Sequence, residues 1–95
     1  MTIITMYSKD NCQWCDKARA QILNDPLNPH SLTYYTEKKL GVDFTKEELQ
    51  AKLPHIEKLT LPQIWFNDTH IGGYTELVEY LVTLYKRKDH DETDV

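Results

Sequence analysis

The sequence predicts a single α/β domain in which helices cover a four-stranded mixed sheet, with the element order β-α-β-α-β-β-α. Two patterns support this fold class. A strand, a helix and a second strand follow one another near the N-terminus, which implies a parallel pair joined by a right-handed crossover. Later, a short polar turn separates two strands, which adds an antiparallel hairpin at the other side of the sheet. The 95 residues suffice for one modest hydrophobic core.

The first half of the chain supplies a strand, a helix and a second strand. Residues 2–7 are β-branched and aromatic and predict a buried strand. From Gln13 onward apolar residues recur at helical spacing, and the turn-forming residues 24–29 end that helix. Residues 32–36 predict the second strand, and residues 37–43 predict its connection to the next helix.

The second half begins with a capped helix. Thr45 and Glu48 form a capping-box pattern, and the helix that they open should end near Leu53, because Pro54 cannot donate a backbone hydrogen bond. Two glycines should later break the hairpin before the last helix. The remaining elements are a strand, a turn, a strand and a helix, over residues 61–66, 67–69, 70–71 and 75–87.

Acidic residues concentrate at the C-terminus. Residues 89–95 hold four of the 15 acids and no Lys or Arg, so residues 1–88 are electrically balanced. We expect residues 1–88 to form the domain and residues 89–95 a disordered acidic tail. A balanced body gives no electrostatic footprint for nucleic acid, and no apolar run is long enough to span a membrane. The N-terminus lacks the features of a secretory signal, which indicates a cytoplasmic protein.

The two cysteines, Cys12 and Cys15, are spaced Cys-x-x-Cys between the first strand and the first helix. The free N–H groups at a helix N-terminus stabilise a thiolate, so the pKa of Cys12 should fall below its ordinary value. Cys15 lies one turn further on the same side of the helix and should be less exposed. This asymmetry predicts that Cys12 attacks a substrate disulfide and that Cys15 resolves the mixed disulfide.

Other uses of a Cys-x-x-Cys pair fit less well. A zinc site needs two more ligands, and no two of the four histidines have the spacing of a ligand pair. A c-type haem needs His directly after the second cysteine, where this chain has Asp16. A structural disulfide would be unusual in the cytosol. We therefore expect a redox-active dithiol and no metal.

Three segments together resemble glutaredoxins: Lys9 ahead of Cys12-Gln13-Trp14-Cys15, Thr60-Leu61-Pro62-Gln63, and His70-Ile71-Gly72-Gly73-Tyr74-Thr75-Glu76-Leu77. The resemblance implies a thioredoxin-like three-layer fold of glutaredoxin size. It also implies a glutathione-dependent thiol-disulfide oxidoreductase that reduces protein disulfides and glutathione mixed disulfides. The motif departs from the family's usual Cys-Pro-Tyr-Cys. A short acidic chain with such a variant is similar to the small glutaredoxins of large bacteriophages.

The resemblance further implies a glutathione groove beside the dithiol. Pro62 would follow a cis peptide bond and expose the backbone of Leu61 to the cysteinyl part of glutathione. The N-terminus of the last helix would receive one carboxylate of glutathione, and Lys9 would face the other. The implied glutathione-binding residues are Lys9, Gln13, Trp14, Thr60, Leu61, Pro62, Gly73, Tyr74 and Thr75.

Three of these residues depart from the family pattern. Gln13 replaces proline and adds a backbone N–H near the first cysteine, Trp14 stands where the family usually has Tyr, and Thr75 stands where many members have Asp. The local sequence also leaves simpler interpretations open. Lys9 could be a solvated loop lysine, Trp14 a core residue, Pro62 a strand-start proline and the glycine pair a hairpin end.

The resemblance implies a monomer with no bound cofactor, glutathione as co-substrate and disulfide-containing proteins as partners, among them ribonucleotide reductase. Two rival functions stay open. The protein could be a thioredoxin-like reductant recharged by a flavoprotein reductase. It could also be a dimer that holds an iron–sulfur cluster through Cys12 and two glutathiones.

Overall fold

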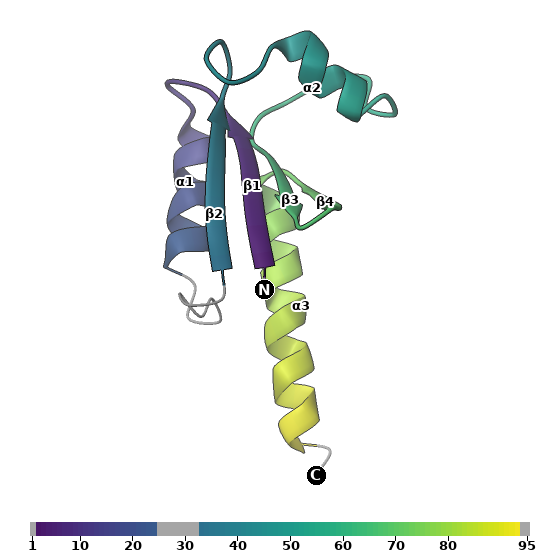
Figure 1. Ribbon diagram of the computed structural model, residues 1–95. Coiled ribbons are helices and arrows are strands. Elements are labelled where there is room, and N and C mark those ends of the chain that lie inside the picture. The colour runs from purple at the N-terminus through teal and green to yellow at the C-terminus, as the bar shows by residue number, and fades with distance from the viewer. Residues whose placement is uncertain (1, 25–32, 94–95) are drawn as a thin grey trace.

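The computed structural model describes residues 2–24 and 33–93, with the backbone alone for Thr2, Thr33 and residues 84–93. Its elements confirm the predicted order (Figure 1). They are β1 (Thr2–Ser8), α1 (Gln13–Leu23), β2 (Thr33–Lys39), α2 (Lys46–Lys52), β3 (Gln63–Phe66), β4 (Thr69–Gly72) and α3 (Tyr74–Thr93).

The four strands form one mixed sheet in the order β2-β1-β3-β4. β1 pairs in parallel with β2 and antiparallel with β3, and β3 continues into the β4 hairpin, as predicted. β1 is therefore a central strand. A four-residue loop, 9–12, connects the carboxyl end of β1 to α1. The dithiol therefore lies at the end of the sheet where this central strand terminates.

Alternating side chains of the central strands divide the core into two layers. Ile4 and Met6 of β1 face one side, where they pack with buried residues of α1 and α3. Tyr7 faces the other side and meets the ring of Phe44 at 4.9 Å and that of Trp65 at 5.1 Å. The buried residues Leu49 and Leu53 of the α2 region complete this second cluster. Helices thus cover both faces of the sheet, which confirms the thioredoxin-like three-layer fold.

Two strands differ from the prediction by two or more residues at one end. β2 continues through Lys39, although a connection was expected from Glu37 onward, because the strand pairs with β1 along its whole length. β3 begins at Gln63 rather than at Leu61, because Pro62 has no N–H to contribute to the ladder.

The last helix also differs. α3 begins at Tyr74 and continues to Thr93, so residues 89–93, expected to belong to a disordered tail, are helical in the structure. No Gly or Pro follows Arg87, and the backbone therefore meets no chemical stop signal there. The predicted turn at residues 25–29, Leu32 and residues 94–95 lie outside the described residues.

Candidate functional site

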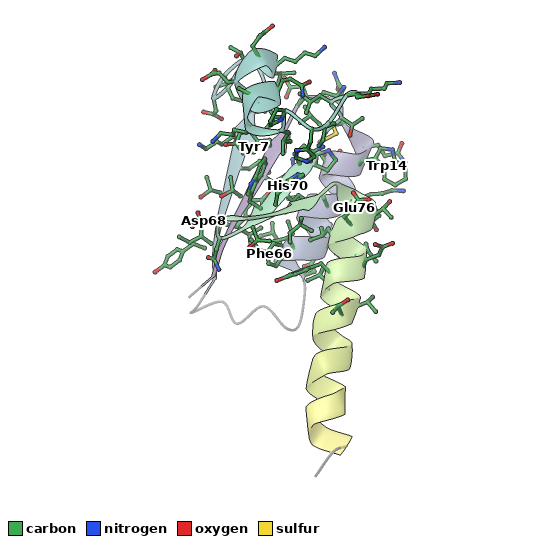
Figure 2. All side chains as sticks on the ribbon, turned by 90° about the vertical axis from the view of Figure 1, so that its right-hand side faces the viewer. Tyr7, Trp14, Phe66, Asp68, His70 and Glu76 are labelled. Carbon is green, nitrogen blue, oxygen red and sulfur yellow. A yellow bond between two sulfur atoms is a disulfide. The ribbon has the colours of Figure 1, made fainter. Side chains whose placement is uncertain are left out.

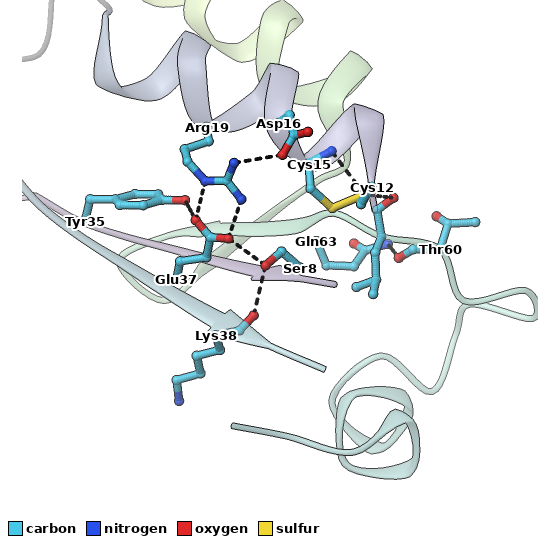
Figure 3. The surroundings of a disulfide bond; sticks show 11 residues. Ser8, Cys12, Cys15, Asp16, Arg19, Tyr35, Glu37, Lys38, Thr60 and Gln63 are labelled. Atoms are coloured by element: carbon cyan, nitrogen blue, oxygen red, sulfur yellow. Dashed lines mark hydrogen bonds and ion pairs between the residues drawn. A yellow bond between two sulfur atoms is a disulfide. The ribbon is translucent and has the colours of Figure 1, made fainter. Parts of the chain in front are cut away.

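The dithiol occupies the N-terminus of α1, as predicted. Cys12 is the N-cap residue, and its sulfur accepts a hydrogen bond from the Cys15 N–H at 3.1 Å. The two sulfurs form a disulfide bond (Figure 3). Cys12 is 7% exposed and Cys15 is fully buried. The sulfur that a substrate can reach is therefore the one that faces the free N–H groups of the helix.

A network of polar side chains fixes the first turns of α1 against the sheet (Figure 3). The Glu37 carboxylate of β2 accepts hydrogen bonds from Ser8, from Tyr35 and, through both oxygens, from the Arg19 guanidinium. Arg19 also pairs with Asp16 at 2.9 Å. The hydrogen bonds from Arg19, followed by those from Ser8 and Tyr35, lower the pKa of Glu37 to about 2 against the opposing effect of burial. Burial and the hydrogen bond to Glu37 raise the pKa of Tyr35.

The segment before β3 faces the dithiol. The Leu61–Pro62 peptide bond is cis, as the resemblance implied. The Leu61 carbonyl oxygen lies 4.0 Å from the Cys12 sulfur. Leu61 precedes the paired residues of β3, so its backbone groups are not part of the ladder with β1.

A buried glutamine holds this segment in place. Gln63 is 4% exposed, and its amide donates to the Thr60 carbonyl at 2.9 Å. Its side-chain oxygen lies 2.7 Å from Nε2 of His70 on β4. Because the oxygen can only accept, Nε2 of His70 must carry the proton. Sequence reasoning missed this relay, although a glutamine at a buried strand position is a usable signal, since buried polar groups need partners.

A hollow of about 230 Å³ opens beside the dithiol. It is lined by Trp14, Thr60, Leu61, Pro62, Gly73, Tyr74, Thr75 and Glu76. The structure thus brings together every predicted groove residue except Lys9 and Gln13. Trp14 is 52% exposed and its ring centroid lies 5.6 Å from that of Tyr74, so it is a wall of the hollow and not a core residue.

Lys9 and Gln13 lie elsewhere. Lys9 lines a second pocket, which shares Trp14, Thr60 and Leu61 with the hollow. Gln13 is exposed on the first turn of α1 and lines neither of the two.

Glu76 is a groove residue that the predicted site did not include. Its Oε1 accepts a hydrogen bond from the Gly73 N–H at 2.7 Å, so the carboxylate takes one N–H at the N-terminus of α3, where Figure 2 labels Glu76. The spacing of Gly73 and Glu76 is that of an N-cap and N3 pair, a signal that the sequence carried. Gly72 has a φ of 122°, and a Cβ there would come within 2.8 Å of Cγ of Glu76.

The described residues, 2–24 and 33–93, contain no group of three or more His, Cys, Asp or Glu placed to hold a metal ion. None of the helices in these residues combines the length and the hydropathy needed to cross a membrane.

Comparisons with known proteins agree with this geometry. Residues 4–71 match the family model described as Glutaredoxin. Glutaredoxin 1 of Escherichia coli strain K12 is 30% identical over 78 residues, which cover 80% of this chain and 88% of the relative, and Glutaredoxin 1 of Shigella flexneri gives the same values. The crystal structure of Glutaredoxin 1 from Francisella tularensis complexed with cacodylate superposes with a TM-score of 0.67. The superposition covers 90% of this chain and 99% of the Francisella chain, at 19% sequence identity. The predicted similarity to bacteriophage members receives no support from these matches.

Proposed function

Since this chain belongs to the glutaredoxin family and is a thiol-disulfide oxidoreductase, we propose that glutathione is the thiol that reduces it. The observation that carries the proposal is the position of the hollow. It joins the backbone of Leu61, whose carbonyl oxygen lies 4.0 Å from the Cys12 sulfur, to the N-terminus of α3 in one concave surface. These are the groups that a tripeptide with a thiol and a carboxylate at each end would need.

The dithiol chemistry follows from the exposure of the two sulfurs. The Cys12 thiolate attacks one sulfur of a substrate disulfide, forms a mixed disulfide and releases the other substrate sulfur as a thiolate, which takes up a proton. The Cys15 thiolate then attacks the Cys12 sulfur and releases the second substrate thiol. Two electrons and two protons pass to the substrate, and the Cys12–Cys15 disulfide remains. A glutathione mixed disulfide needs the first step alone.

Glutathione reverses this oxidation. One glutathione thiolate attacks the Cys12 sulfur, because Cys15 is buried, and the Cys15 thiolate leaves. A second glutathione attacks the sulfur of the bound glutathione and leaves with it as glutathione disulfide. The Cys15 N–H, at 3.1 Å from the Cys12 sulfur, stabilises the Cys12 thiolate that this second step releases.

Each part of glutathione has a counterpart in the site. The cysteinyl backbone would pair with Leu61, and the carboxylate of the γ-glutamyl end would meet the backbone N–H groups of Tyr74 and Thr75. Trp14 would flank the bound thiol, and Lys9 would attract the glycine carboxylate beyond it. Gln13, which lines neither pocket, would contribute only its backbone N–H near Cys12.

The cellular setting belongs to the same proposal. The protein would act as a monomer in the cytoplasm, bind no metal or other cofactor, and reduce disulfide-containing proteins, with ribonucleotide reductase as the expected substrate.

Trapping the mixed disulfide tests the proposal. The Cys15→Ser variant should accumulate one glutathione on Cys12, detectable by mass, and should keep the reduction of glutathione mixed disulfides while it loses the reduction of protein disulfides. Cys12→Ser should lose both activities. With both cysteines present, Thr75→Ala should raise the KM for glutathione several-fold. Thr69→Ala, at a threonine that is also exposed but lies outside the hollow, should leave this KM unchanged.

Two outcomes would instead support the rival functions. Reduction by NADPH and a flavoprotein reductase, without reduction by glutathione at any ratio of glutathione to its disulfide, would make the protein a thioredoxin-like reductant. A coloured dimer after anaerobic reconstitution with iron and sulfide would indicate a cluster-binding member.

A further inference from the structure

We propose that the second pocket, on the far side of Trp14 from the glutathione hollow, binds a polypeptide substrate through an apolar side chain and a neighbouring carboxylate. The substrate segment would lie within a few residues of the cysteine that Cys12 attacks. The inference rests on the dithiol chemistry of the family, and on the proposed function in that glutathione takes the hollow and that glutathione and the polypeptide use Lys9 in separate steps.

The pocket is large and apolar. Its volume is about 450 Å³, roughly twice that of the hollow. Phe44, 6% exposed, and the fully buried Leu49 form its floor, and both belong to the core cluster between the sheet and α2. The remaining lining residues are Lys9, Trp14, Leu40, Lys46, Leu59, Thr60 and Leu61. A floor of packed core residues makes this a preformed recess for one apolar side chain.

The charges around the pocket favour a carboxylate next to the apolar side chain of the ligand. Lys9 and Lys46 are exposed at its rim, and among the residues that the structure describes no carboxylate lines it. Asp10, next to Lys9, pairs with Lys39 at 2.8 Å, and Glu48, two residues after Lys46, accepts the Thr45 N–H at 2.9 Å. Glu47, next to Lys46, lines a different pocket. A carboxylate beside the bound apolar side chain would complement the two ammonium groups.

The pocket also lies close to the reacting sulfur of Cys12. It shares Trp14, Thr60 and Leu61 with the hollow, and the Leu61 carbonyl oxygen lies 4.0 Å from the Cys12 sulfur. An extended chain advances about 3.3 Å per residue, so residues two to four positions from a cysteine joined to Cys12 can reach the recess. Glutathione has no side chain of this kind, which makes a polypeptide the better occupant.

Single-turnover reduction of three cyclic disulfide peptides tests this inference. The peptides differ only in the residues two and three positions after one cysteine, which are Leu-Glu, Leu-Lys or Gly-Glu. The protein is reduced with dithiothreitol and desalted, so glutathione takes no part. The wild type should reduce the Leu-Glu peptide about fivefold faster than either of the others, the size of effect expected from one rim ion pair or one partly buried side chain.

Charge reversal at the rim supplies the decisive comparison. Lys46→Glu should invert the preference between the Leu-Glu and Leu-Lys peptides. Lys58→Glu makes the same charge change at an exposed lysine outside the pocket and should leave the rate ratio within about twofold of the wild type. Equal effects of the two variants, or equal rates for the three peptides in the wild type, would overturn the inference.

Two other results distinguish this inference from dimer formation and from the proposed function. If a second copy of the chain fills the pocket, the protein will sediment as a dimer and Lys46→Glu will shift its sedimentation and not the peptide ratio, which would also overturn the inference. If the peptide preference holds while glutathione fails to reduce the oxidised protein, only the proposed function is refuted.

Discussion

Replacing Glu37 by Gln should destabilise the oxidised protein by about 1–2 kcal/mol at neutral pH and should remove part of its acid sensitivity. The Glu37 carboxylate ties β1, β2 and α1 together, because it accepts hydrogen bonds from Ser8, from Tyr35 and from both nitrogens that Arg19 presents. Gln preserves the size of the side chain, so the change tests the charge and the acceptor geometry rather than packing.

The magnitude follows from the pKa of Glu37. The fall in its pKa from 4.5 to about 2 corresponds to about 3.5 kcal/mol at about 1.4 kcal/mol per pH unit. The Arg19 side chain is 35% exposed, and solvent screening reduces this figure to about 1–2 kcal/mol. The folded pKa is the lower one, so the stabilisation is complete above pH 4.5 and is lost as the pH falls through about 2.

Urea denaturation of both proteins in their oxidised forms, between about pH 7 and pH 2.5, measures this contribution. The stability difference between wild type and Glu37→Gln should shrink by more than half from neutral pH to about pH 3. Glu57→Gln, at an exposed carboxylate between α2 and β3, serves as the control and should change stability by at most about 0.5 kcal/mol. A pH-independent difference between wild type and Glu37→Gln would refute the assignment of the stabilisation to the ionised carboxylate.

Three more perturbations follow from the structure. Gln63→Leu should cost about 1–3 kcal/mol in urea denaturation, because it leaves the Thr60 carbonyl and the His70 ring without their partner. Burial, and then the charge of His55, lower the pKa of His70. The folded protein should therefore lose stability as the pH falls below about 6.5. His70→Gln should make this loss smaller in urea denaturation. Gly72→Ala should destabilise by about 1–3 kcal/mol through its positive φ and its contact with Glu76. In a Glu76→Ala background, which lacks that contact, the same substitution should cost less, and thermal denaturation of the single and double variants measures the difference.

Local chemistry was sufficient to predict the elements that open with a cap. Thr45 and Glu48 exchange the two hydrogen bonds of the predicted capping box, at 3.1 and 2.9 Å, and α2 begins directly after them. Cys12 caps α1 for the same reason, because a loop residue that precedes a helix must face its free N–H groups. Such signals depend on residues three or four positions apart, and the sequence contains them in full.

Two of the missed features depend on contacts between different helices and strands. β2 extends to Lys39 because it pairs with all of β1, and Glu37 becomes part of it beside an arginine 18 positions away. The link between Gln63 and His70 crosses a hairpin that contains a register shift. A pattern of alternating residues predicts on which face of the sheet a side chain lies. It does not predict which residue of another element contacts that side chain, so these contacts could not be predicted from the sequence.

The exposed indole of Trp14 gives the protein its own optical probe. The chain has two tryptophans, and the second, Trp65, is packed against the rings of Tyr7 and His70. Trp14 instead stands in water as the shared wall of the hollow and the second pocket, with the Lys17 ammonium 4.5 Å from its ring centroid. A ligand that covers it will move its emission to shorter wavelengths, while Trp65 keeps a constant background. Filling of either side of the site can thus be followed in solution without a label.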